Sequence, residues 1–128
     1  MRAAAAWVVL AALAAGCGKE TEPTAGTLMI SLVTPNVDDG ALRLTVYGGR
    51  IGVITAADPA YRLFVGRPDS NSAHVIVTGP VGAGPLLRID VPDAGLVSSY
   101  GATVQEAAAR TTFESRVLTG YATTVAQE

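Results

Sequence analysis

The chain has 128 residues, with nine basic and eleven acidic side chains and a formal net charge of −2. This length is typical of a single domain, and the lack of a basic excess argues against nucleic acid as a partner. The single cysteine excludes an internal disulfide bond and a zinc site built from several cysteines.

The first residues have the pattern of a secretory signal peptide. Arg2 supplies a positive charge, and residues 3–13 form an uncharged apolar run. A helix that spans a bilayer needs about 20 apolar residues, so this run is too short to do so. It has the length of the apolar region of a signal peptide, and small residues follow it. We therefore predict that residues 1–16 are a signal peptide.

The end of the apolar run resembles the lipobox of bacterial lipoproteins. Leu13, Ala14, Ala15 and Gly16 lead directly into Cys17, with Ala14 at the position that most often carries leucine. The resemblance implies signal-peptidase recognition of these four residues, cleavage before Cys17 and a diacylglyceryl thioether on the Cys17 sulfur. Two alternatives stay open: an ordinary signal peptide with a chance cysteine at its end, and an uncleaved anchor.

Residues 17–26 are predicted to be the lipidated cysteine and a flexible tether. The stretch GKETEPTAG after Cys17 has no large apolar side chain, so it buries too little surface to offset the entropy of ordering it. Gly18 occupies the position where an aspartate favours retention in the inner membrane of Gram-negative bacteria. The resemblance therefore implies the cell envelope as the location, and the outer membrane, at its periplasmic or surface face, if the host is Gram-negative.

Residues 27–128 are predicted to be an all-β domain. Apolar and polar side chains alternate with a period of two, as in half-buried strands. Turn-forming Gly, Pro, Asn and Asp residues separate these runs, and about eight short strands in this rhythm favour an antiparallel β-sandwich. The predicted strands are 27–34, 40–49, 50–56, 61–66, 73–79, 86–91, 99–104 and 120–126.

The segment 103–110, TVQEAAAR, contains strong helix formers. We expect the seventh strand to continue to about Ala107 and a loop to follow as far as Ser115. A short helix or turn after this strand is the alternative.

The rhythm of these elements resembles cohesin-like and immunoglobulin-like sandwiches of bacterial surface proteins. The stretches PNVDDGALRLTV, GPLLRIDVP and SSYGATVQEAAAR carry this resemblance, and the pattern TPNxDDGA also resembles small, uncharacterised bacterial lipoproteins. The resemblance implies a sandwich fold. It assigns no dockerin-contacting residue to this chain, and a fold analogy alone does not give a function.

Oxygen-bearing side chains in the first long loop are the main metal candidates, and the loop 69–72 is judged in the same way. Asn36, Asp38 and Asp39 carry oxygens of the kind that calcium prefers. The same residue types hydrogen-bond to the local backbone and permit a turn, and no EF-hand pattern is present. We therefore predict no metal site and no cofactor.

No cluster of residues predicts catalysis. His74 is the only histidine, and the chain has neither a G-x-S-x-G nor an H-E-x-x-H motif. Asp90 and Asp93 flank Pro92 at a strand end, where turn formation explains them better than a glycosidase pair. Tyr47 and Tyr61 are the aromatic residues considered for glycan binding.

The sequence thus predicts a lipid-anchored cell-envelope protein whose β-sandwich has a non-catalytic binding or structural role. The expected partners are the membrane, through the lipid, and an envelope protein or glycan. The alternatives are a carbohydrate- or calcium-dependent binding module, an accessory subunit of an envelope complex and, last, an envelope hydrolase.

Overall fold

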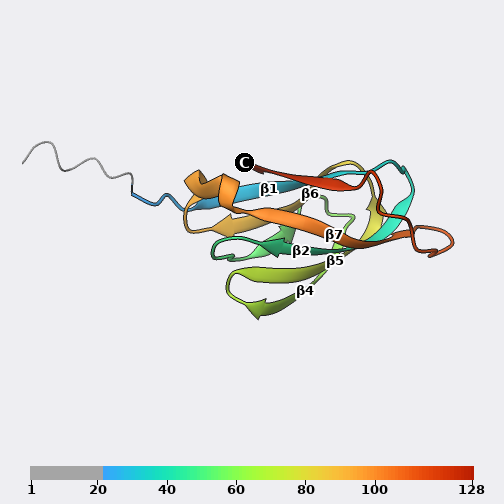
Figure 1. The fold of residues 1–128 in the computed structure, drawn as a ribbon, viewed down its shortest axis with the longest axis horizontal. Helices are drawn as coiled ribbons and strands as arrows, with labels where there is room; N and C mark the ends of the chain where they lie inside the picture. Colours follow the sequence, from blue (N-terminus) through green and yellow to red (C-terminus); the bar gives the residue numbers. More distant parts are fainter. Residues whose placement is uncertain (1–21) are drawn as a thin grey trace, which may run out of the picture.

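The computed structural model describes residues 22–128 and contains two four-stranded antiparallel sheets. The predicted all-β sandwich of about eight strands is confirmed (Figure 1). The strands are β1 (Gly26–Val33), β2 (Asp39–Tyr47), β3 (Ile54–Ala56), β4 (Arg62–Asp69), β5 (Ser72–Val81), β6 (Gly84–Val91), β7 (Gly101–Ala109) and β8 (Ala122–Gln127).

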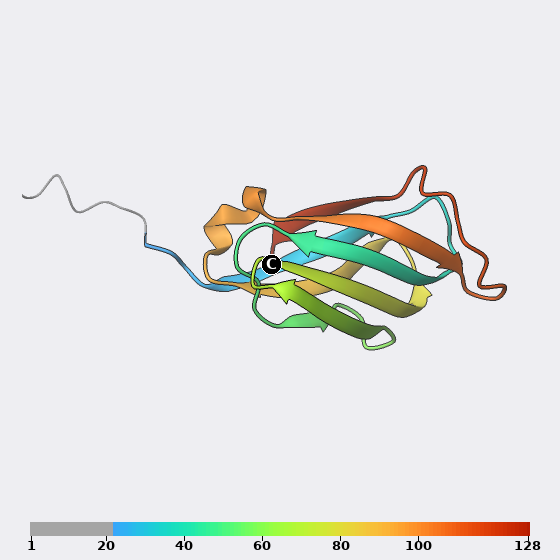
Figure 2. The same cartoon turned by 60° about the horizontal axis from the view of Figure 1, so that its bottom comes forward.

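The chain passes from one sheet to the other at nearly every connection. The first sheet has the order β3-β6-β1-β8, and the second has the order β4-β5-β2-β7. Figure 2 shows β7, β2, β5 and β4 side by side in the second sheet. Only β4 and β5 are consecutive strands of one sheet, and they form a hairpin that closes with Asp69 opposite Ser72.

The inward-facing side chains follow the predicted alternation. The central strands β1 and β2 bury every second residue, because one face of each sheet packs on the other sheet. The largest fully buried side chains are Leu28, Ile30, Leu32, Leu42, Leu44, Leu86, Leu87, Ile89, Val46, Val75, Val77 and Val81.

The structure differs from the sequence prediction mainly at the ends of elements. The predicted strand 50–56 is shortened to β3, because Ile51 and Gly52 form irregular backbone hydrogen bonds to Ser70 and Asp90. A 3-10 helix, η2 (Ala94–Ser99), stands where we expected a turn. The Asp93 carboxylate accepts a hydrogen bond from the Gly95 amide at its start.

The segment rich in helix formers belongs to a strand. β7 continues through it to Ala109, and it buries Ala107 and Ala109 beneath the sheet. The register with β2 shifts between Arg43 and Leu44, so β7 holds one extra residue there. Burial of small side chains therefore outweighs the helix propensity of this segment.

Candidate functional site

The residues of the predicted lipobox, Leu13, Ala14, Ala15, Gly16 and Cys17, lie outside the described residues. The structure shows where the chain after Cys17 joins the domain. Residues 22–25 are exposed and belong to no strand or helix. The Thr24 carbonyl nevertheless accepts a hydrogen bond of 2.9 Å from the Ala94 amide, and β1 starts at Gly26.

This entry point defines two ends of the sandwich. The N-terminal segment and η2 lie at one end, and the long β7–β8 loop, residues 110–121, lies at the other (Figure 1). We call the end with the β7–β8 loop the far pole. It comprises the β7–β8 loop and the β1–β2 loop, residues 34–38. If the chain is tethered through its N-terminus, the far pole is the end that points away from the tether.

The predicted oxygen-rich residues meet a basic residue at the far pole. The Arg116 guanidinium lies 2.7 Å from an Asp38 carboxylate oxygen and 3.4 Å from one of Asp39. Asp39 is fully buried, and its two oxygens also accept hydrogen bonds of 2.7 Å from the Thr34 and Tyr121 hydroxyls. The Asn36 side-chain amide donates to the Tyr121 hydroxyl at 2.8 Å.

This network joins the two loops of the far pole rather than presenting free oxygens. Asp39 already receives two hydroxyl donors and a guanidinium charge, so its charge is balanced within the protein. Within residues 22–128, no group of three or more His, Cys, Asp or Glu side chains is arranged to hold a metal ion. Burial, reinforced by the hydrogen bond to Asp39, raises the pKa of the Tyr121 hydroxyl.

Sequence reasoning found the acidic half of this network and missed the other half. Arg116 and Tyr121 are 78 and 82 residues away from their carboxylate partners. No local pattern signals such a contact, because it arises only when the β1–β2 and β7–β8 loops meet at one end of the sandwich.

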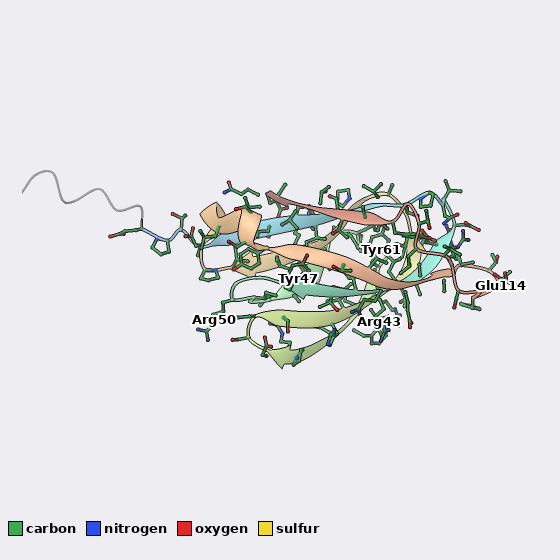
Figure 3. The ribbon with its side chains drawn as sticks, in the orientation of Figure 1. Arg43, Tyr47, Arg50, Tyr61 and Glu114 are labelled. Atoms are coloured by element: carbon green, nitrogen blue, oxygen red, sulfur yellow. The ribbon has the colours of Figure 1, made fainter. Side chains whose placement is uncertain are left out.

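The outer face of the second sheet carries a shallow cavity of about 160 Å³. Ala41, Ile76, Ala108 and Ser115 are among the residues that line it. Arg43 and Glu106 also line it and form an exposed ion pair of 2.9 Å. Figure 3 labels Arg43. Sites for small molecules usually have about 300–1,000 Å³, so this cavity has room for one side chain or a small group.

His74, Asp90 and Asp93, the other residues considered for catalysis, lie within hydrogen-bonding distance of neighbouring residues of the fold. The His74 ring nitrogen Nδ1 lies 3.1 Å from the Thr45 hydroxyl on the exposed sheet face. An Asp90 oxygen accepts a hydrogen bond from the Thr27 hydroxyl at 3.1 Å, whereas Asp93 caps η2. Asp90 thus belongs to a strand pair rather than to the expected turn, whereas Asp93 starts a helix.

The two tyrosines considered for glycans differ in their accessibility. Tyr47 is half exposed, but its ring covers the backbone of Gly101, where an added Cβ would approach the Tyr47 hydroxyl to 2.7 Å. Tyr61 is partly buried and packs against the core. Figure 3 labels both side chains. One face of the Tyr47 ring is therefore the aromatic surface that a sugar can reach at these positions.

Comparison of the chain with models of known protein families, with curated proteins and with solved structures finds no match. Among residues 22–128, no helix has both the length and the apolar character that crossing a membrane requires. The resemblance to bacterial lipoproteins and to cohesin-like or immunoglobulin-like modules accordingly stays a prediction from the sequence.

Proposed function

We propose that this chain is a lipid-anchored cell-envelope protein and that its β-sandwich has a non-catalytic binding or structural role. One observation carries the proposal: an apolar run with a basic start ends in small residues followed directly by Cys17. These features agree on one process, in which the signal is removed and the cysteine sulfur carries the lipid.

The entry of the chain into the fold supports this arrangement. The hydrogen bond between Thr24 and Ala94 attaches the chain to the domain at Thr24, so the spacer between Cys17 and this point is six residues long in the sequence, 18–23. Six residues extend over about 20 Å. The spacer therefore keeps the sandwich close to the membrane and lets its far pole face away from it.

Two acyl chains or more are needed for a durable attachment, since a single chain binds only marginally. The proposed thioether carries two, in the diacylglyceryl group. In a Gram-negative host, Gly18 after the cysteine makes the outer membrane the proposed destination.

Metabolic labelling with a clickable palmitate analogue tests the anchor. We expect the wild-type chain and a Thr124→Ala control, an exposed change on β8, to be labelled and to sediment with membranes. Cys17→Ala is expected to lose the label. Equal labelling of Cys17→Ala and the wild type, or a purified natural chain that keeps residues 1–16, would refute the proposal.

A calcium-dependent binding module is the alternative with a specific structural test. A ligand that binds only the native state raises the unfolding midpoint. We expect millimolar calcium to leave the midpoint unchanged, because Arg116 already lies against both Asp38 and Asp39. A rise of several degrees that disappears in Asp38→Ala would favour the calcium module instead.

A further inference from the structure

The strand β4 presents the one long open edge among residues 22–128. The sandwich has four edge strands, and β3 is only three residues long. On the other side, β7 and β8 run beside each other, and the Thr123 hydroxyl donates to the Ala102 carbonyl at 2.6 Å. By contrast, β4 has eight residues, of which seven are exposed.

Only one half of β4 has features that protect an edge from further pairing. Its second half contains Arg67 and Pro68 and a shift of register after Gly66. Its first half, 62–66, pairs with β5 alone, and within the described chain no backbone hydrogen bond reaches its outer side. Such an unpaired row of amide and carbonyl groups is a template for another strand.

The open half of β4 is also apolar on both of its faces. Phe64 is 58% exposed and lies opposite Ile76 of β5, which is 40% exposed, on the outer face of the sheet. Val65 lies opposite the buried Val75 and therefore points toward the interior. It is nevertheless 41% exposed, because β4 is the edge strand of its sheet.

We propose that β4 pairs antiparallel with β4 of a second copy of this chain, with Phe64 opposite its own counterpart. Antiparallel pairing of two identical strands places a two-fold axis perpendicular to the sheet, and such an interface must be self-complementary. Around Phe64 this condition is met. Leu63 faces Val65 of the second copy on the inner side, and Arg62 faces Gly66 on the outer side.

The charges and the apolar residues both fit this register. Arg62 meets a glycine rather than another cation, so no like charges stand directly opposite each other. The outer face gains a continuous apolar row in the order Ile76, Phe64, Phe64, Ile76, since Phe64 and Ile76 are already paired within each copy. Aromatic pairs directly across two strands are among the stabilising ones.

This pairing has a geometric consequence for the assembly. The two-fold axis reverses the strand direction, so the two N-terminal segments leave from opposite ends of a continuous eight-stranded sheet. Both far poles are then also at opposite ends. Contact through one strand buries less area than a standard interface, so we expect a dimer that dissociates on dilution in the micromolar range.

Single cysteines in the full-length chain, purified in detergent, test the register. Phe64→Cys places two sulfurs across the axis, at the separation of directly opposite residues. We expect mild oxidation to link this variant into a dimer. The matched control is Arg62→Cys on the same face: its two copies are separated by about 13 Å along the strands, beyond the Cα separation of about 7 Å that a disulfide allows. Every cysteine variant also carries Cys17→Ser, so the introduced cysteine is the only one in the chain.

A mixture of Arg62→Cys and Gly66→Cys provides a second arm. An added Cβ at Gly66 meets only the His74 carbonyl oxygen, at 4.0 Å, so this substitution has room. We expect oxidation to link Arg62→Cys to Gly66→Cys in the mixture. Neither variant should form a linked dimer by itself. Equal cross-linking of Phe64→Cys and Arg62→Cys, or no link in the mixture, would overturn the register.

Sedimentation equilibrium of the full-length chain tests the dimer itself. We expect the wild type at 100 μM to have the mass of two chains, and Phe64→Lys that of one. Val117→Lys, at another exposed apolar position in the β7–β8 loop, should remain dimeric. A monomeric wild type at this concentration, or equal masses for Phe64→Lys and the wild type, would refute β4 pairing. Unchanged circular dichroism spectra would establish that both lysine variants are folded.

Discussion

Replacing the buried Asp39 by alanine should be among the most destabilising single changes at the far pole. Asp39 is fully buried and accepts hydrogen bonds from two hydroxyls, those of Thr34 and Tyr121. Its carboxylate also lies 3.4 Å from Arg116, whose side chain is only 19% exposed. The variant Asp39→Ala leaves the two hydroxyls without this acceptor and the Arg116 guanidinium without this charge.

The size of the effect follows from these contacts. A hydrogen bond to a charged group contributes about 1.5–3 kcal/mol, and removal of one partner of a buried ion pair costs about 3–5 kcal/mol. These contributions overlap, because they belong to one carboxylate. We therefore expect Asp39→Ala to lower the free energy of unfolding by about 3–5 kcal/mol, out of a total of about 5–15 kcal/mol for a domain.

Asp38→Ala is the matched control. Asp38 is the adjacent residue and pairs with the same Arg116, but its side chain is 53% exposed. An exposed ion pair contributes about 0–1 kcal/mol, so Asp38→Ala should have a small effect. Urea denaturation followed by far-ultraviolet circular dichroism measures both. Equal losses for the two variants, or a loss below about 1 kcal/mol for Asp39→Ala, would refute the role assigned to burial.

Three further predictions follow from particular side chains. Burial raises the pKa of Tyr100 and Tyr121 in the folded state, so the folded chain keeps these protons at a pH where the unfolded chain has lost them. The free energy of unfolding should therefore fall as the pH rises above about 10. In a pH series of unfolding midpoints, Tyr121→Phe should reduce this fall. Leu44→Ala should lower the free energy of unfolding in urea by about 2–5 kcal/mol, because Leu44 is fully buried in a central strand. Val37 is 89% exposed, so Val37→Ala should change this free energy by less than about 0.5 kcal/mol. Equal effects of the two variants would contradict the core assignment. Phe113 has a φ of 58° and a side chain that is 77% exposed, so Phe113→Gly should be neutral or stabilise the fold by up to about 1 kcal/mol; a clear loss in thermal unfolding would mean that the ring makes contacts that its exposure does not indicate.

The two surfaces of the sandwich that carry exposed apolar residues have different structural support. At the far pole, Val37, Phe113 and Val117 project from loops that the Asp39 network holds together. At β4, the exposed side chains belong to a strand whose outer backbone is unpaired. Variants at Phe64 and Val117 therefore separate strand pairing from any contact made by the loops.

The sequence by itself determined the fold class and the residues that face the core. Alternation is a local property: in a strand, residues i and i+2 share a face, so Leu42, Leu44 and Val46 identify their buried side without knowledge of any partner strand. The lipobox resemblance is local in the same way, because it depends on contiguous residues that end at Cys17.

Only the tertiary structure decided which distant residues meet. Asp39 became the centre of a buried network because the β7–β8 loop brings Arg116 and Tyr121 to it across about 80 residues. The helix-forming residues before Ala109 are part of β7 because they pair with β2 at the edge of the second sheet. The open edge of β4 is likewise a property of strand order, which hydrophobic periodicity does not encode, since a central strand and an edge strand can share the same alternation.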